Sequence, residues 1–108
     1  MSKIVLIDSR DPLETGPGDW LHDTARDLAS TGASVTVYLV QNGVLAARRG
    51  VRGDPAARIL RAGVEVLADD FSLRERGVRT AQLVKGVVVA PIEVVAEAMG
   101  QGARVLWR

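Results

Sequence analysis

Residues 34–49, SVTVYLVQNGVLAARR, hold the pattern that decides the fold. Residues 34–40 are almost all apolar, β-branched or aromatic, and a run that is apolar on both faces is typical of a strand in a covered parallel sheet. The run stops at the polar turn 41–43, and residues 44–49 are expected to form a short helix. Open α/β sheets place ligand sites beyond the carboxyl ends of their strands, so this polar turn is a candidate binding site.

The rest of the chain repeats the same unit of apolar strand and capped helix. Asp54-Pro55 is a clear helix start, with Asp at the N-cap and Pro at the first helical position, and glycines end several of the helices. We predict four further strands at residues 3–8, 64–68, 86–90 and 103–107, and helices at residues 19–31, 54–63, 70–76 and 91–100, with one more short turn at residues 81–85.

Alternation of strands and helices predicts a parallel sheet with right-handed crossovers and helices on both faces. No linker divides the 108 residues, so we expect one domain over residues 1–108. Five strands favour a single flavodoxin-like α/β domain with the strand order 2-1-3-4-5.

Two helices carry specific expectations about which side chains are buried. In helix 91–100, the spacing i, i+3, i+4, i+7 places Ile92, Val95, Ala96 and Met99 on the face toward the core. In helix 19–31, His22 falls on the polar side, where a solvated surface histidine is a better interpretation than a catalytic one.

Composition excludes several kinds of chemistry. The chain has no cysteine, so it lacks disulfides, a thiolate nucleophile and cysteine-ligated metal, and one histidine is too few for a histidine-based metal site. A net charge of +1 gives no general attraction to nucleic acid. No apolar run approaches the roughly 20 residues of a membrane span, and the chain enters a strand at once, so we expect a cytoplasmic protein without a signal peptide.

No recognised catalytic or phosphate-binding motif occurs in the sequence, so we predict no catalytic residue, no bound metal and no cofactor. The remaining ligand-binding candidates share a position at the carboxyl ends of strands, and they are Asp8, Ser9, Arg10, Gln41, Asn42, Gly43, Asp69 and Asp70. We expect Asp8, Ser9, Asn42 and Asp69 to line one shallow pocket. Each group also has a structural explanation, because Asp69-Asp70 can cap a helix and Asn42-Gly43 suits a turn with positive φ.

Charge is distributed unevenly along the chain. Residues 8–27 hold six carboxylates and two arginines, whereas residues 48–61 hold five arginines and one carboxylate. Together with the apolar residues after the second strand, which the expected order places at the sheet edge, this asymmetry suggests self-association. The interface candidates are Val44, Leu45, Arg48, Arg49 and Arg52. An ordinary solvated surface is the alternative interpretation of the charges.

Three stretches carry a resemblance to a known family: VTVYLVQNGVLAARRG, GVEVLADDFSLRERGV and LVKGVVVAPIEVVAEAMGQGARVLW. In order and spacing they resemble the DsrE/DsrF-like family of small sulfur-relay proteins over nearly the whole chain. The resemblance implies a flavodoxin-like domain, a homo- or hetero-oligomer and protein partners in a sulfur pathway. Some members carry a persulfide on a cysteine just after the third strand.

That cysteine would fall near Ala68 or Asp69, and this chain has none. A persulfide requires a thiolate sulfur, so sulfur transfer is not carried over. We therefore expect a non-catalytic, homo-oligomeric subunit, a dimer or trimer, or an accessory protein. The alternatives are a small-anion or nucleotide-binding protein, and a cysteine-independent enzyme at the strand-end rim.

Overall fold

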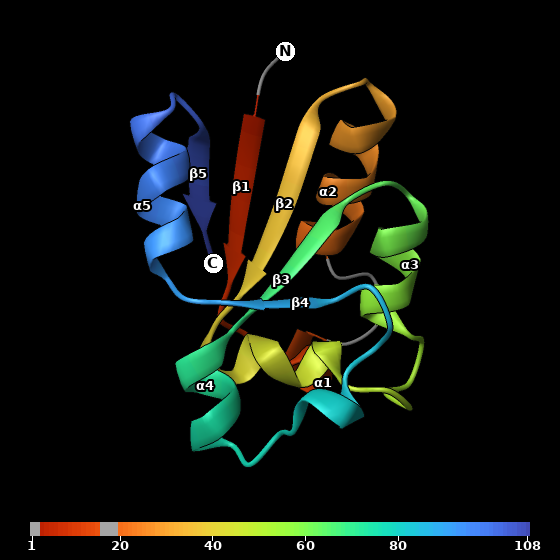
Figure 1. The fold of residues 1–108 in the computed structure, drawn as a ribbon. Helices are drawn as coiled ribbons and strands as arrows, with labels where there is room; N and C mark the ends of the chain where they lie inside the picture. The colour runs from red at the N-terminus through yellow and green to blue at the C-terminus, as the bar shows by residue number, and fades with distance from the viewer. Residues whose placement is uncertain (1–2, 16–19) are drawn as a thin grey trace.

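The computed structural model describes residues 3–15 and 20–108, and five parallel strands form its single sheet (Figure 1). All four strand pairs are parallel. The predicted α/β fold with a five-stranded parallel sheet and helices on both faces is thus confirmed. The strands are β1 (Lys3–Asp8), β2 (Ser34–Leu39), β3 (Glu65–Asp69), β4 (Val88–Ala90) and β5 (Arg104–Trp107).

Helical segments connect the strands at most of the predicted places. They are α1 (Pro12–Thr15), α2 (Trp20–Ser30), the 3₁₀ segment η1 (Gln41–Ala47), α3 (Pro55–Arg61), α4 (Asp70–Glu75), the 3₁₀ turn η2 (Thr80–Gln82) and α5 (Glu93–Gly100). Asp19, the first residue of the helix predicted at residues 19–31, lies outside the described residues.

The strand order is β4-β3-β2-β1-β5, so the predicted order 2-1-3-4-5 was wrong in detail. The prediction put the second strand at an edge, whereas β2 lies in the middle. The residues of β2 explain this, because Val35, Val37 and Leu39 are buried on one face of the sheet while Tyr38 is buried on the other. An edge position would leave part of this two-sided apolar strand in water.

The two faces of the sheet are covered by different helices (Figure 1). From β1 to β4 the chain moves across the sheet in one direction, and α2 and α3 pack on one face through Leu21, Ala25 and Ile59. The return from β4 to β5 runs the opposite way. Because crossovers keep one hand, α5 lies on the other face, where Val95 and Ala98 are buried.

Two expectations about helix faces are corrected. His22 is not solvated but only 7% exposed. In α5 the buried residues are Val95 and Ala98, whereas Ile92 and Met99 are 43% and 58% exposed. Of the four residues expected to face the core, only Val95 is buried, and Ala96 is exposed as well.

Candidate functional site

The carboxyl ends of β1, β2 and β3 lie side by side, because these strands are neighbours in the sheet. Asp8 ends β1, Gln41 opens the turn after β2, and Asp69 ends β3. The predicted rim of strand ends is therefore formed by adjacent strands. Since β2 lies between the other two, the turn at its end separates the two carboxylates.

Asp8 is the centre of one buried polar cluster. Its side chain is 2% exposed, and Arg108 donates to it through Nη2, at 2.9 Å, and Nε, at 3.4 Å. His22 Nε2 lies 3.3 Å from Oδ2, and the backbone N–H of Arg10 donates to Oδ1 at 3.1 Å. Burial alone would raise the pKa of Asp8, but the contacts with His22, Arg108 and Arg10 outweigh it and hold the pKa below its ordinary value. Asp8 is thus a paired carboxylate at neutral pH.

Arg108 joins this cluster to the start of α2. Its guanidinium lies 5.2 Å from the ring centroid of Trp20, which is a cation–π contact. Ser9 Oγ donates to the carbonyl oxygen of Arg108 at 2.5 Å. The last residue of the chain is therefore tied to the end of β1 and to the first residue of α2.

Asp69 is the centre of a second cluster. Its Oδ2 accepts hydrogen bonds from the backbone N–H and the hydroxyl of Ser72, at 2.9 and 2.6 Å, which caps α4. Its Oδ1 accepts from the hydroxyl of Tyr38 at 2.7 Å, and that hydroxyl also lies 3.1 Å from the carbonyl oxygen of Ala90. Burial alone would raise the pKa of Asp69, but the hydrogen bonds from Ser72 and Tyr38 hold it below its ordinary value. Burial and the Asp69 carboxylate raise the pKa of Tyr38, so its hydroxyl keeps the proton that it donates.

The turn after β2 links the two clusters. The backbone N–H of Gln41 donates to Ser72 Oγ at 2.7 Å, and Gln41, not Gly43, has the positive φ of 53°. Gly43 is needed for another reason, because a Cβ there would lie 2.0 Å from the backbone oxygen of Asp8. The expected positive φ at Asn42-Gly43 is therefore replaced by a close approach of η1 to β1.

The other predicted site residues lie at the surface of this rim. Asn42 Oδ1 accepts from Arg76 Nε at 3.0 Å, and Asp70 Oδ2 lies 3.6 Å from Arg74 Nη1. Arg10 is exposed. The shared pocket of Asp8, Ser9, Asn42 and Asp69 stays a prediction.

Both buried carboxylates are occupied by donors from the protein itself. A carboxylate that caps a helix or pairs with a guanidinium stabilises the fold, and a raised pKa would be the usual sign of a general acid. Among the described residues no group of three or more His, Cys, Asp or Glu side chains is placed to hold a metal ion. The geometry of the rim thus favours structure over acid–base chemistry.

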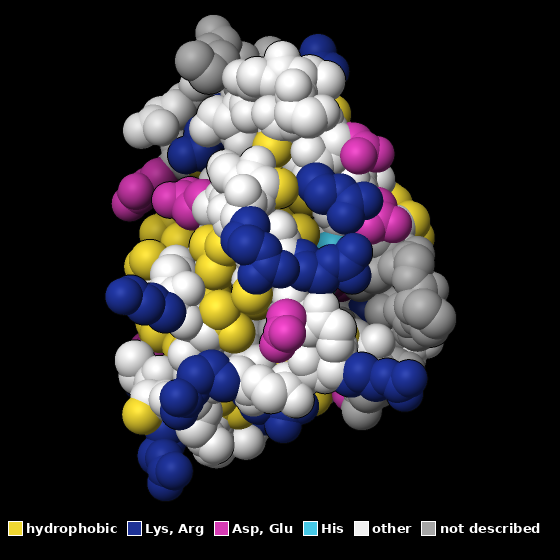
Figure 2. Space-filling view, turned by 90° about the vertical axis from the view of Figure 1, so that its right-hand side faces the viewer, with side chains coloured by type: hydrophobic (Ala, Val, Ile, Leu, Met, Phe, Trp, Pro, Cys, Tyr) yellow, Lys and Arg dark blue, Asp and Glu magenta, His cyan; other side chains and the backbone are white. Residues whose placement is uncertain are grey.

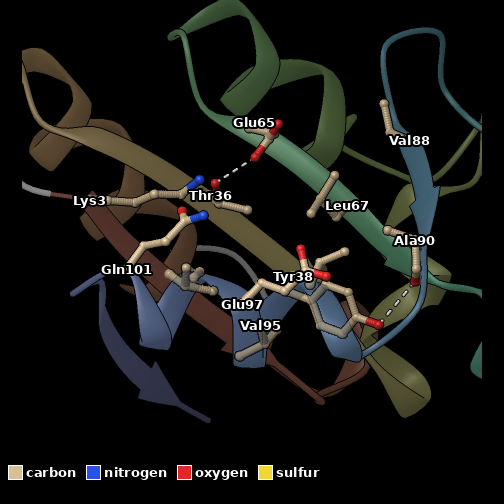
Figure 3. Close-up of a pocket in the computed structure, with 13 residues that line it drawn as sticks. Lys3, Thr36, Tyr38, Glu65, Leu67, Val88, Ala90, Val95, Glu97 and Gln101 are labelled. Atoms are coloured by element: carbon tan, nitrogen blue, oxygen red, sulfur yellow. Dashed lines mark hydrogen bonds between the residues drawn. The ribbon is translucent and has the colours of Figure 1, made fainter.

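A hollow of about 310 Å³ lies elsewhere, on the sheet face beside α5 (Figure 3). We call it the sheet-face groove. Residues of β1–β4, including Tyr38, Leu67 and Val88, form its floor. Residues of α5 form its wall. Lys3, Glu65 and Glu97 line it with charge, and Glu65 accepts from Thr36 Oγ1 at 2.7 Å. A second hollow of about 420 Å³ lies between α4 and β4 and is lined partly by Asp70. Neither hollow was predicted from the sequence.

The interface candidates differ in how much of them reaches the surface. Val44 is fully buried within the chain, so its side chain could not contact another copy, while Leu45 is half-buried. Arg48 Nε donates to the carbonyl of Leu45 and Arg49 Nη2 to that of Ala81, and Arg52 is exposed. Figure 2 shows Lys and Arg side chains spread over the molecular face on the side of α3. The apolar patch expected after β2 is therefore largely core, while Arg49 and Arg52 are exposed and Arg48 is half-buried.

Sequence reasoning missed the residues that complete the two clusters. Ser72 had a local signal, because it stands three residues after Asp69, where an N-cap side chain finds its donor. Tyr38 and Arg108 had none, since they reach Asp69 and Asp8 across 31 and 100 residues of chain. His22 was placed on the polar face of its helix, and only the fold shows that this face meets Asp8.

In the part of the chain that the structure describes, no helix is long and apolar enough to span a membrane. No protein-family model matches the sequence, and no curated protein matches it. Solved structures match it well in fold. MTH1491 from Methanobacterium thermoautotrophicum, a protein of unknown function, aligns with a TM-score of 0.84 and 20% identity over 100% of both chains.

Two other solved structures give the same picture. The ychN protein from E. coli aligns with a TM-score of 0.83 and 22% identity over 100% of both chains. BT1422 from Bacteroides thetaiotaomicron, a conserved protein of unknown function, aligns with a TM-score of 0.81 and 18% identity over 99% of this chain and 95% of its own. At these identities the comparisons show that the chain shares the fold of these proteins, and they show nothing about its function.

Proposed function

We infer that this chain is a DsrE-like oligomeric subunit or accessory binding protein, which acts beside proteins of a sulfur pathway without carrying a persulfide. The observation that carries this inference is the hydrogen bonding of the Asp69 carboxylate. Asp69 is the last residue of β3, near the place where the family resemblance puts the sulfur-carrying cysteine, and its oxygens accept from Ser72 and Tyr38. A carboxylate committed to a helix cap supports a structural role at this position.

The fold gives further support, because it persists without the cysteine. The strand end and the capped helix α4 are present, while the chain holds no thiol anywhere. Sulfane sulfur is transferred between proteins as a persulfide on a cysteine. A subunit without cysteine would therefore bind its partners but would not transfer sulfur itself. Assembly with its own copies and contact with protein partners are the roles that remain.

Two measurements test this inference. Light scattering on the purified protein at micromolar concentration should give an oligomer, and a monomer would contradict the proposed role. Incubation with a cysteine desulfurase and cysteine should add no sulfur to the intact mass. The Asn42→Cys variant, with one thiol at an exposed position, is the positive control for loading. Stable addition of one sulfur atom to the wild-type chain would overturn the exclusion of sulfur transfer.

A second candidate function is the binding of a small anion or nucleotide at the strand-end rim. The observation in its favour is that Arg10, Gln41 and Asn42 are exposed there, above a framework of paired carboxylates. A ligand retained in native mass spectra would support this candidate, and its loss in an Arg10→Ala variant would place it at the rim. Turnover abolished by Asp69→Asn in a folded protein would instead support an enzyme.

A further inference from the structure

Helix α5 has apolar side chains on two sides. Val95 and Ala98 face the sheet, each 7% exposed. Ile92, Ala96 and Met99, spaced i, i+4, i+7, form a second line that is exposed, and we call it the α5 stripe. The charged residues of this helix are Glu93 and Glu97. A helix that is apolar on most of its circumference is normally buried on most of it.

The sheet beside α5 is also incompletely covered. The strand register puts Ile7, Tyr38, Leu67 and Val88 in one row on the α5 face. Ile7 and Tyr38 are buried, Leu67 is half-buried, and Val88 is 54% exposed, so cover decreases toward β4. Figure 3 shows Tyr38, Leu67 and Val88 of this row leading away from α5 along the floor of the sheet-face groove. Parallel sheets are normally covered on both faces, so the β3–β4 half lacks a layer.

The charges around the groove indicate which partner fits. Lys3 lies on β1, Glu65 on β3 and Glu97 on α5, so the three charges surround the groove (Figure 3). A two-fold contact brings each residue of the surface near the same surface of the other copy, so a charged surface complements itself when it carries both signs of charge. A partner of uniform charge would meet a like charge on this rim.

We propose that the sheet-face groove and the α5 stripe together form a two-fold interface with a second copy of this chain. A two-fold axis along the strand direction puts the α5 stripe of each copy over Leu67 and Val88 of the other. The two α5 helices then lie side by side between the two sheets, and each sheet gains the missing helix. Such an isologous contact closes at a dimer. This inference rests on the proposed oligomeric function and names its contact surface.

The test uses charged substitutions at matched exposure. Met99→Lys and Val88→Lys put a charge at positions 58% and 54% exposed, within the proposed interface. Leu106→Lys is the control, because Leu106 is 57% exposed but lies on β5, on the opposite face of the sheet. Leu45→Glu tests the contact around η1 that the sequence predicted.

Light scattering should give the wild type, Leu106→Lys and Leu45→Glu at twice the subunit mass of 11.5 kDa. Met99→Lys and Val88→Lys should give the subunit mass with native circular dichroism, because an unpaired charge in the contact disfavours association. If both remain oligomeric, the proposed surface is wrong while the oligomeric function stands. If the wild type is monomeric, the oligomeric function fails as well and a second copy is excluded as the occupant.

A covalent trap confirms the arrangement without relying on loss of binding. Because the chain has no cysteine, the double variant Ala96→Cys/Val88→Cys introduces the only thiols. Mild oxidation should give a disulfide-linked dimer on a denaturing gel, since a disulfide needs Cα atoms within about 7 Å. The matched pair Ala96→Cys/Leu106→Cys should stay monomeric on the gel. Equal cross-linking of both pairs, or of neither, would overturn the arrangement.

Discussion

Asp69 shows how partners, and not position, decide the role of a residue. A carboxylate at the end of a strand is compatible with acid–base chemistry, ligand binding or a helix cap. In the fold it receives two hydrogen bonds from Ser72 and one from Tyr38, and these lower its pKa against the effect of burial. The carboxylate at the end of β3 thus holds α4 in place.

The lowered pKa values predict how stability depends on pH. A carboxyl whose pKa is lower in the folded state stabilises the protein above its unfolded pKa, near 3.8, and loses that contribution as pH falls through the folded value. We expect Asp69→Asn to lower the free energy of unfolding by about 1–3 kcal/mol at pH 7, because a buried charged acceptor is replaced. The difference from wild type should shrink below pH 3.8, as urea titrations across pH would show.

Asp23→Asn is the matched control for this experiment. Its carboxylate is 46% exposed and pairs with Arg26, which is 44% exposed. Exposed pairs of this kind contribute less than about 1 kcal/mol to stability. The free energy of unfolding of this variant should therefore stay close to that of the wild type at every pH. An Asp69→Asn protein with wild-type stability at pH 7 would show that the cap does not need the charge.

At the scale of elements, the sequence predicted the features that depend on neighbouring residues, namely the positions of the strands and helices. The five strands and most helices lie close to their expected positions, because period, caps and glycine stops are properties of neighbouring residues. The cap at Asp69 was foreseen as an alternative for the same reason. The strand order was not foreseen, although the two-sided burial of Val37 and Tyr38 is the signal that would have placed β2 inside the sheet.

The candidate site was harder to predict, because its contacts are long-range. Strand ends located Asp8 and Asp69, but Arg108 and Tyr38 approach them only after the sheet forms. The uncovered β3–β4 surface beside α5 depends on the strand order, so no local pattern contains it. The amphipathic pattern of α5 is ambiguous too, since apolar side chains occupy both the sheet side and the α5 stripe.

The packing of η1 against β1 leads to a prediction for Gly43. In Gly43→Ala, the new Cβ would lie 2.0 Å from the backbone oxygen of Asp8, so η1 or β1 must move. We expect a loss of at least about 2 kcal/mol in the free energy of unfolding, in the range found for overpacking. Chemical denaturation followed by circular dichroism measures this loss.

Gly100→Ala separates this steric effect from the general effect of replacing glycine. Gly100 ends α5, and a Cβ there would meet no atom within 4 Å. Alanine in a helix is favoured over glycine by about 1 kcal/mol, so this variant should be as stable as wild type or more stable. Equal effects of the two substitutions would mean that the close approach to Asp8 is relieved at no cost.

At the scale of the whole molecule, the uneven cover of the sheet follows from the topology. Three crossovers run in one direction from β1 to β4, and one returns from β4 to β5. With a single hand of crossover, α2 and α3 share one face and α5 has the other face largely to itself. A helix about 10 Å wide covers about two strands, so it cannot cover five. An open half-face is thus built into this chain, and a second copy is what we propose to cover it.

If a second copy covers that face, the stability of the protein must depend on its concentration. Unfolding of a dimer releases two chains, so dilution favours the unfolded state by mass action. For a subunit of 108 residues we expect the thermal midpoint to rise by about 2–4 °C for each tenfold increase in protein concentration. Met99→Lys should unfold at a lower midpoint that does not change with concentration, whereas Leu106→Lys should behave as wild type. Calorimetry at protein concentrations from roughly 5 to 500 μM would measure this dependence of the midpoint on concentration. A wild-type midpoint that stays constant over these concentrations, with reversible unfolding, would contradict the dimer.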